Sequence, residues 1–481
     1  MRQHAAEPLL KEMPWATRTL GIHLQHDPVS GNSSRSLRSA DLPVTALVQP
    51  GVRHNNPRRA HLLVSTVLGK HLPTDPRLVL GAGNRLGDLV REVLGIREAV
   101  VLGFAETATG LGHCVAARIG ASCYLHSTRR AVPHAQTLAG FEEGHSHATS
   151  HLLQPTPADI FVNDLPLVLV DDEISTGATA IDAVRALHAF SPRAHYVLAS
   201  LVDLRSTADR IAFDSAATEL GARIDTVCLA TGRASLPDGL IDAVGALPSP
   251  QLNPTAGHPG SFHRVELPWP AAVPEGGRHG ILASDTDAFE AALCEAADAL
   301  TVRLDTAFAD RPAIVLGHEE LMYLPLRLAA LLADAGRPTR FQTTTRSPAY
   351  VLDEPGYPLR RGFRFVAPEP GDIAPRYLYN AHWPDDSPDL PEVAEAGSSA
   401  LVAAAIPARG AGDTTGPADP VLVVVVDSPA DTAELVAEGG LIDVLTTSGA
   451  DVLLAVLREA DPRQLHAERA ESPRLVAGSR P

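Results

Sequence analysis

Between residues 74 and 203 the sequence alternates short apolar runs with amphipathic segments, a pattern that few folds accommodate. The apolar runs do not alternate with polar residues, as strands with one wet face would. They therefore indicate parallel strands that are covered on both faces by the intervening helices. The predicted strands are Arg77–Leu80, Ala99–Phe104, Ser122–His126, Leu167–Val170 and His195–Val202. The predicted helices include Asn84–Leu94, Leu111–Ile119 and Thr179–Phe190. We expect an α/β domain built on a mostly parallel sheet.

A change of composition separates this domain from a second one. Prolines and glycines cluster over residues 248–260 and 267–277, where no regular element could run for long. Beyond them a second α/β unit is predicted, with strands at Ala313–Gly317, Thr339–Thr344 and Val421–Val426 and a helix at Leu321–Ala335. We therefore divide the chain into an N-terminal extension, a first α/β domain, a Pro/Gly-rich linker, a second α/β domain and a charged, frayed tail. Their predicted bounds are 1–40, 41–232, 233–277, 278–461 and 462–481.

The composition argues against several classes of protein. The formal net charge is −17 and no long Lys/Arg-rich run occurs, which argues against a nucleic-acid partner. The longest dense apolar run, Val421–Val426, is too short to span a bilayer, and the N-terminus lacks the apolar stretch of a signal peptide. The four cysteines lack C-x-x-C spacing, which argues against a zinc ribbon and a disulfide framework. We expect a cytoplasmic protein that binds a small molecule and has no membrane or nucleic-acid partner.

The segment VLVDDEISTGAT, at Val168–Thr179, combines two kinds of ligand group. A buried strand delivers Asp171 and Asp172 to its carboxyl end, where ligands of open α/β sheets bind. A helix then begins among small residues and hydroxyls, so that its free N–H groups and its dipole favour a phosphate. Gly177 allows the backbone to approach that phosphate closely. Carboxylates beside a phosphate must hold sugar hydroxyls or a cation such as Mg²⁺. A sugar phosphate suits both the carboxylates and the phosphate-binding turn.

This layout resembles the signature with which type I phosphoribosyltransferases bind 5-phosphoribosyl-1-pyrophosphate (PRPP). Every position matches, except that Ala178 stands where glycine is frequent. The resemblance implies that Asp171 and Asp172 contact the ribose hydroxyls and that Mg²⁺ enters near them with PRPP. It also implies a loop that wraps the 5-phosphate, formed by Ser175, Thr176, Gly177, Ala178 and Thr179. An accidental strand, loop and helix start is the alternative interpretation.

A second segment, Ala99–Arg130, reads as strand, loop, helix, strand and two arginines. The resemblance implies that backbone N–H groups of its loop bind pyrophosphate. The loop residues are Ala105, Glu106, Thr107, Ala108, Thr109 and Gly110. Arg129 and Arg130, at the end of the next strand, would then neutralise the leaving group through charge-assisted hydrogen bonds.

Residues 131–163 stand where this family usually carries a flexible loop that closes over the reacting bond. The stretch includes FEEGHSHATSH, from which we single out Glu143, His145 and His147. These side chains could cap pyrophosphate, could chelate a divalent metal through their spacing, or could form a solvated polar loop. Closure would keep water away from the reactive sugar cation.

Two further stretches, Gly51–Pro76 and Phe341–Phe365, narrow the resemblance. Together with GFAETATGLGH and EEGHSHAT they are similar to bacterial two-domain phosphoribosyltransferases that carry a C-terminal TRSP domain. That family occurs in gene neighbourhoods linked to tellurite resistance and stress. The N-terminal stretch could form a hood that recognises the acceptor or could be a solvated face. Its polar residues are Arg53, Asn55, Arg58, Arg59, Lys70 and His71.

The second domain repeats a spacing of the first. Glu320 follows Gly317 as Glu106 follows Gly103, and a helix and strand then lead to a Thr-Arg pair in both domains. This repeated spacing could indicate a duplicated, partly degenerate half-site, or it could occur in two ordinary β–α–β units. No DDxxxTG pattern follows Val421–Val426, so we assign this domain no transferase activity of its own. The candidate residues here are Glu320, Thr345, Arg346, Ser347 and Pro348.

The sequence therefore predicts a phosphoribosyltransferase that moves the phosphoribosyl group of PRPP to, or from, a nitrogenous base or related acceptor. Mg²⁺ and arginines would stabilise the departing pyrophosphate while the acceptor attacks from the opposite side. The resemblance implies a role in making a nucleotide or nucleoside-like metabolite linked to stress or tellurite resistance, and it allows a homodimer. A non-catalytic PRPP sensor or a scaffold protein is the alternative.

Overall fold

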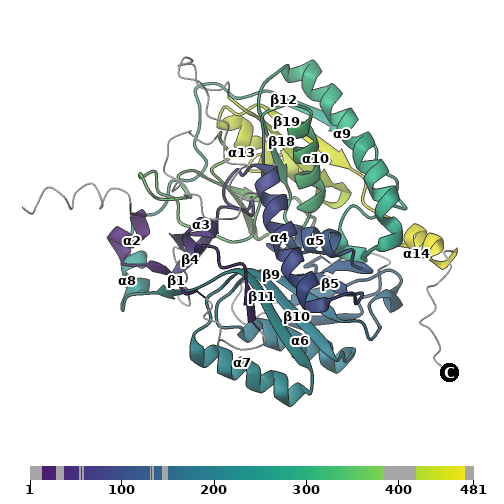
Figure 1. Cartoon of the computed structure of the whole chain (residues 1–481). Helices are drawn as coiled ribbons and strands as arrows, with labels where there is room; N and C mark the ends of the chain where they lie inside the picture. Colours follow the sequence, from purple (N-terminus) through teal and green to yellow (C-terminus); the bar gives the residue numbers. More distant parts are fainter. Residues whose placement is uncertain are drawn as a thin grey trace, which may run out of the picture.

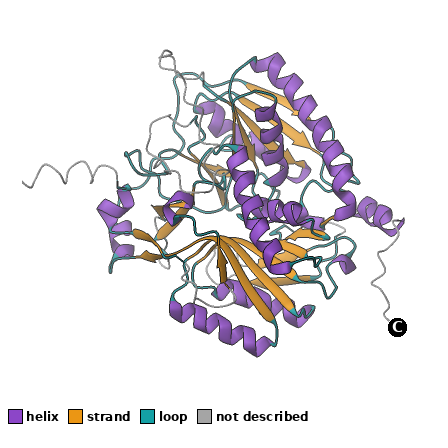
Figure 2. Ribbon diagram, viewed as in Figure 1, coloured by secondary structure: helices purple, strands orange, loops and turns teal. Residues whose placement is uncertain are grey.

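The computed structural model describes residues 13–28, 37–53, 56, 59–130, 132, 135–142, 150–383 and 419–471. Its strands gather into two main sheets, with helices between the sheets and on their outer faces (Figures 1 and 2). We call the elements around the larger sheet the first domain and those around the smaller sheet the second domain. The predicted α/β class is confirmed for both.

The larger sheet has eight strands in the order β1-β11-β10-β9-β5-β6-β13, with β2 also paired to β11. Its central pairs are parallel, whereas β1 and β13 join the edges antiparallel. The strands are β1 (His23–His26), β2 (Leu37–Ser39), β5 (Val100–Gly103), β6 (Cys123–His126), β9 (Leu167–Ile174), β10 (His195–Asp203), β11 (Arg223–Ser235) and β13 (Ile281–Leu282). The helices are α4 (Pro76–Leu94), α5 (Thr109–Ile119), α6 (Ala178–Phe190) and α7 (Thr207–Leu220).

Successive residues of the central strands enter two different cores, because side chains alternate across a sheet. Val101 and Val168 pack into the core that contains α4 and α5. Leu102 and Leu169 pack into the core that contains α6 and α7. The strands are therefore apolar on both faces, which is the basis of the pattern seen in the sequence.

The smaller sheet has five parallel strands in the order β12-β19-β18-β14-β15. The strands are β12 (Phe262–Glu266), β14 (Ala313–Gly317), β15 (Thr339–Thr343), β18 (Val421–Asp427) and β19 (Val452–Leu457). One face is covered by α9 (Thr286–Phe308) and α10 (Tyr323–Asp334). The other face packs against α12 (Ala433–Val436), α13 (Leu441–Thr447) and a hairpin of β16 (Gly362–Val366) and β17 (Pro375–Tyr379).

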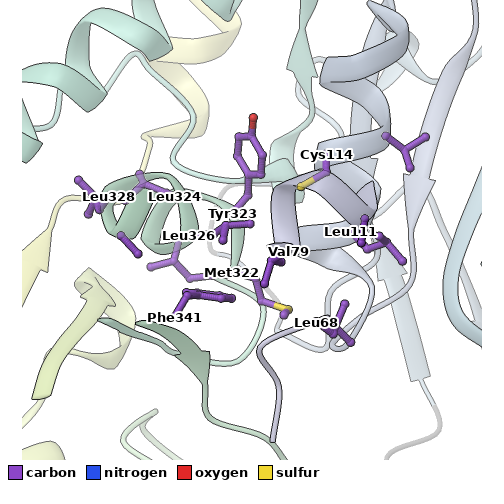
Figure 3. Packing of buried hydrophobic residues seen from close by; sticks show 14 of the residues in the cluster. Leu68, Val79, Leu111, Cys114, Met322, Tyr323, Leu324, Leu326, Leu328 and Phe341 are labelled. Atoms are coloured by element: carbon purple, nitrogen blue, oxygen red, sulfur yellow. The ribbon is translucent and has the colours of Figure 1, made fainter. Parts of the chain in front are cut away.

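The two domains share one hydrophobic core. Met322 and Tyr323 of the second domain meet Val79 of α4 and Leu111 and Cys114 of α5 (Figure 3). A first-domain segment also lies along β15, since Thr74 N–H donates to Phe341 O at 2.9 Å. Fully burying one such aliphatic side chain stabilises the folded chain by about 1.5–3 kcal/mol. The domains are therefore packed as one body.

The remaining described elements are short. A hairpin of β3 (Val48–Val52) and β4 (His61–Ser65) lies between β2 and α4 in the chain, and a hairpin of β7 (Ala139–Glu142) and β8 (Ser150–Leu153) follows β6. The short helices are α2 (Trp15–Leu20), α3 (Val44–Leu47) and α8 (Leu240–Gly245). Within the described ranges, no helix combines the length and apolar character that crossing a bilayer requires.

The strand predicted at Arg77–Leu80 is wrong, because these residues form the first turns of α4. Pro76 occupies the first helical position, and the Asp75 carboxylate accepts a hydrogen bond from Arg77 N–H at 2.9 Å, so a helix begins here. Gly83 then faces α5, where an added Cβ would lie 2.3 Å from Cys114 Cβ. Of the run Arg77–Leu80 only Val79 is fully buried, in a helical stripe that continues through Ala82 and Leu86.

The chain between the domains also differs from a plain linker. Residues 233–277 contain α8 and β12, and β13 then returns to the first sheet to pair with β6. The tail that was expected to fray begins with α14 (Pro462–Glu471), where Leu465 is buried. Arg469 of α14 donates to Gly280 O at 2.8 Å, which attaches this helix to the start of β13.

Candidate active site

The two aspartates predicted at the centre of the site lie near the carboxyl end of β9, between β5 and β10. Pairing with β5 ends at Val170, so Asp171 is the first residue beyond that ladder. Each carboxylate accepts a hydrogen bond from the next backbone N–H, at 2.9 Å for Asp171 and 3.1 Å for Asp172. These bonds orient both side chains at the edge of the sheet where ligands of such folds bind.

The turn after β9 has the backbone that a phosphate loop requires. Ser175 and Thr176 are exposed, whereas Gly177 is buried and has a φ of +84°. A Cβ at Gly177 would lie 3.0 Å from Arg205 Cδ, so both the conformation and the space favour glycine. Helix α6 starts at Ala178, and its first N–H groups have no intrahelical partner. The exposed hydroxyls and this helix start together suit a phosphate.

The predicted pyrophosphate loop, Ala105–Gly110, starts beside Asp171. Phe104 N–H donates to Val170 O at 3.1 Å, immediately before the first aspartate. Ala105 N–H donates to Ser127 Oγ at 3.0 Å, which ties the loop to the end of β6. The peptide bond between Ala105 and Glu106 is cis.

Within this loop, Thr107 is half-buried and the other residues are buried. Its hydroxyl accepts a hydrogen bond from Lys70 Nζ at 2.6 Å. The last two predicted loop residues, Thr109 and Gly110, form the first turn of α5. The Glu106 carboxylate turns away toward the second domain, where it accepts hydrogen bonds from Thr345 Oγ1 and from Arg346 N–H. The loop therefore joins the site to the second domain.

Basic groups from the N-terminal stretch lie close enough to the aspartates to interact with their charge. Burial raises the pKa of Asp172 above its ordinary value, and Lys70 partly offsets that rise. Arg59 forms an ion pair with Glu173, which directly follows the two aspartates. Burial and the charge of Arg59 lower the pKa of His61 to about 4, so that imidazole is neutral at physiological pH. The three acids of residues 171–173 thus lie near two cations, Arg59 and Lys70, and the neutral His61.

Sequence analysis predicted some of the charged residues around Asp171 and Asp172 and missed others. Lys70 and Arg59 were among the predicted hood residues, whereas Glu173 and His61 were not. Glu173 follows the two aspartates directly, and His61 opens the apolar strand β4, so each carried a weak local signal. His71 is buried and stacks at a tilt against Tyr379, 5.5 Å between ring centroids. Arg53 is described, while Asn55 and Arg58 lie outside the described residues.

The strand-end residues after β6 contact the second domain. Glu320 Oε2 accepts a hydrogen bond from Thr128 Oγ1 at 2.7 Å, and Glu320 Oε1 accepts one from Arg129 N–H at 2.8 Å. The guanidinium of Arg130, predicted at the pyrophosphate end, turns toward the second domain. There it forms ion pairs with Glu369 and with Asp427, the latter at 3.4 Å.

The TRSP residues lie at the end of β15, opposite this strand end. The Arg346 guanidinium pairs with Glu319 at 2.8 Å and with Asp372 at 3.3 Å. Ser347 N–H donates to Thr345 Oγ1 at 3.0 Å, which closes a tight turn. Pro348 is half-buried after it. The predicted lid residues Glu143, His145 and His147 lie outside the described residues.

A buried cluster of charges follows β14. His318, Glu319 and Glu369 place potential ligand atoms within 4.8 Å of one another. Glu319 already forms ion pairs with Arg346 and Arg376, and Glu369 pairs with Arg130. The arginines supply the positive charge that a cation would otherwise bring, so the cluster is compensated by protein groups.

The family comparisons agree with the two-domain architecture. Residues 47–233 match the family described as phosphoribosyl transferase, and residues 275–445 match the family described as the TRSP domain C-terminal to it. The first match identifies residues 47–233 as a phosphoribosyltransferase domain and supports a phosphoribosyltransferase enzyme. The order of the two matches places it in the two-domain family in which a TRSP domain follows the transferase domain, which confirms the resemblance.

Solved structures of adenine phosphoribosyltransferases are similar to part of the chain. The Trypanosoma brucei enzyme is 15% identical, covers 42% of this chain and 82% of its own, and has a TM-score of 0.30. The Rhodothermus marinus enzyme is 16% identical, covers 38% and 94%, and has a TM-score of 0.26. At these scores, the adenine specificity of those enzymes remains a property of those enzymes. No curated protein matches the chain.

Proposed function

We propose that the site at Asp171–Thr179 binds PRPP and transfers its phosphoribosyl group to, or from, a nitrogenous base or related small acceptor, with release of pyrophosphate. The observation that carries the proposal is the sequence of features after β9. Two oriented carboxylates are followed by a left-handed Gly177 and a helix start with exposed hydroxyls. A ligand with adjacent hydroxyls at one end and a phosphate at the other matches that order of groups.

Each part of the site has a role in this proposal. Asp171 and Asp172 hold the ribose hydroxyls, and Ser175–Thr179 wrap the 5-phosphate. The loop Ala105–Gly110 receives the pyrophosphate, with Lys70 beside Thr107 to balance its charge. Preorganised N–H groups and cations at that end stabilise the charge that develops on the leaving group.

Mg²⁺ fits the residues present. Hard divalent cations take oxygen ligands, and both carboxylates are already oriented by backbone N–H groups. Asp172 also carries a raised pKa because burial disfavours its charge, so a nearby cation would stabilise its ionised form. When bound with PRPP, the ion would neutralise negative charge on the pyrophosphate.

The acceptor would bind under Arg59, a predicted hood residue, and His61, whose Nε2 lies 3.2 Å from Arg59 Nε. The resemblance to the two-domain family supports a product of the nucleotide or nucleoside-like kind, made in the cytoplasm and connected with stress or tellurite resistance. The absence of a long basic run supports a small molecule as acceptor instead of a nucleic acid.

The test is release of pyrophosphate from PRPP with Mg²⁺, screened over purine and pyrimidine bases and amine acceptors. We expect acceptor-dependent release that is lost in an Asp171→Asn/Asp172→Asn double variant. Asp182→Asn is the matched control, since Asp182 lies on the exposed face of α6 and pairs only with Arg185 at 3.2 Å among the described contacts. Release that persists in the double variant, or that never depends on an acceptor, would overturn the proposal.

A further inference from the structure

The second domain repeats the order of elements of the transferase core. In the first sheet β10, β9, β5 and β6 are neighbours, and in the second sheet β19, β18, β14 and β15 are neighbours in the same order. A long helix precedes β5 and β14, a helix joins each to the next strand, and an antiparallel hairpin precedes β9 and β18. Both sheets are visible with their helices in Figure 1.

The registers align the two domains residue by residue. Gly103 of β5 pairs with Val170 of β9, and Gly317 of β14 pairs with Val425 of β18. Asp427 therefore occupies the position of Asp172, and α12 starts at the same spacing after Asp427 as α6 after Asp172. At the position of the left-handed Gly177 the second domain has Thr432, with a φ of −123°. The copy has lost the phosphate turn.

The strand-end turns are duplicated as well. Ala105 N–H donates to Ser127 Oγ at 3.0 Å, as Glu319 N–H donates to Thr344 Oγ1 at 3.1 Å. In both domains the threonine after that hydroxyl pairs with the following hairpin, through Leu152 in the first and Tyr377 in the second. Repeats of this detail in hydrogen bonding would not be expected of two unrelated β–α–β units.

Each copy contributes one glutamate that accepts hydrogen bonds from the other copy across the interface. Glu320 of the second domain accepts hydrogen bonds from Thr128 Oγ1 and Arg129 N–H of the first. Glu106 of the first domain accepts hydrogen bonds from Thr345 Oγ1 and Arg346 N–H of the second. Each domain thus fixes the strand end of the other through one buried carboxylate.

We propose that the second domain is a degenerate copy of the transferase core, docked as a pseudo-symmetric partner, and that its Glu320 is a positioning residue for the pyrophosphate end of the first domain's site. This inference rests on the proposed function. Thr128 and Arg129 directly follow Ser127, whose hydroxyl holds the start of the pyrophosphate loop. Two hydrogen bonds to one carboxylate fix the direction of that strand end before any ligand arrives.

The environment of Glu320 suits that task. Its side chain is buried, and Arg278 and Arg130 hold its pKa below the ordinary value despite the burial. An ionised acceptor forms stronger hydrogen bonds than a neutral one. The second copy is closed to a ligand of its own, because Asp427 already pairs with Arg130 and Arg278.

The test compares two ligands that report on opposite ends of the site. Calorimetric titration of the full chain with Mg²⁺ and either pyrophosphate or ribose 5-phosphate is measured for the unaltered protein and for Glu320→Gln. We expect pyrophosphate binding to weaken on the order of tenfold, the effect of losing a charged acceptor, and ribose 5-phosphate binding to stay unchanged. Glu290→Gln, which alters a half-exposed second-domain pair with Arg327, is the control and should change neither.

Thr128→Val removes one of the same bonds from the first-domain side, and Thr128→Ser restores it. We expect the valine variant to reproduce the selective loss and the serine variant to recover it. Unchanged pyrophosphate binding in both Glu320→Gln and Thr128→Val would overturn the inference, as would an equal loss of both ligands. If the unaltered chain bound neither ligand, the proposed function itself would fall, and this inference with it.

Discussion

At the scale of the residue, the site depends on a few positions where the backbone conformation or the charge favours one kind of amino acid. Gly177 has the left-handed φ that other residues adopt only at a cost, and Asp171 and Asp172 are oriented by their neighbours' N–H groups. These features were predictable because they are local: strand, acids, glycine and helix start are contiguous in sequence. The direction of Arg130 was not predictable, since its partners Glu369 and Asp427 lie far along the chain.

Replacing Gly177 by alanine tests the phosphate turn. We expect a loss of about 1–2 kcal/mol in the free energy of unfolding from the left-handed backbone, and a further loss of PRPP affinity because the added Cβ displaces Arg205. Gly221→Ala is the control, because Gly221 has a φ of +65° and nothing within 4 Å of an added Cβ. The control should lose similar stability and no affinity. Equal PRPP affinity in the two variants would contradict the assignment of the turn.

At the scale of the element, periodicity predicted most strands and helices correctly but failed where an apolar run was short. RLVL at Arg77–Leu80 fits a buried strand and one face of a helix equally well. The helix is favoured because Asp75 caps its N-terminus and Pro76 occupies its first position. The contact of α4 with α5 explains why glycines occur inside a long helix, where they otherwise cost about 1 kcal/mol each relative to alanine.

The packing of α4 on α5 makes a prediction of its own. Gly83→Ala puts a Cβ 2.3 Å from Cys114 Cβ, so the helices must separate although alanine is the better helix former. We expect a loss of about 1–3 kcal/mol in the free energy of unfolding from overpacking, measured by denaturant titration. A Gly83→Ala/Cys114→Ala pair does not relieve the clash, because Cβ remains, whereas Cys114→Gly does. A Gly83→Ala variant as stable as the unaltered protein would contradict this packing.

At the scale of the whole molecule, the second domain supports the site of the first. It supplies Glu320 to the end of β6, and β15 holds the segment that carries Lys70, since Thr343 N–H donates to Gly69 O at 2.9 Å. The sequence echo between Glu106 and Glu320 suggested a repeat. That the two carboxylates cross the interface required the three-dimensional arrangement, because each partner lies in the other domain.

Replacing Arg130 tests how the second domain packs on the first. The Arg130 guanidinium is nearly buried between Glu369 and Asp427, so Arg130→Met leaves two carboxylates without their cation. Breaking a buried pair from one side costs about 3–5 kcal/mol, and we expect thermal unfolding to begin at a clearly lower temperature. Arg185→Met, which removes a half-exposed pair on α6, should change stability by no more than about 0.5 kcal/mol. Similar midpoints for the two variants would contradict the buried role of Arg130.

Histidines that partial or complete burial keeps neutral predict how stability depends on pH. Burial lowers the pKa of His61 and of His126 to about 4 and that of His279 to about 3. The unfolded chain, with ordinary histidine pKa values, binds more protons below about pH 6.5, so stability is complete above that pH and falls as pH drops toward 4. Thermal midpoints measured from about pH 7.5 to about pH 4.5 should decrease steadily below about pH 6.5. A midpoint that stays constant over that range would show that these histidines are not buried as described.

On the proposed function the chain has one PRPP site, at Asp171–Thr179, although it carries two copies of the core. The most direct test is the stoichiometry of PRPP binding in the presence of Mg²⁺, measured by calorimetric titration of the full chain and of the Asp171→Asn/Asp172→Asn variant. We expect one PRPP per chain and no binding by the variant. Two equivalents per chain, or binding that survives in the variant, would contradict it.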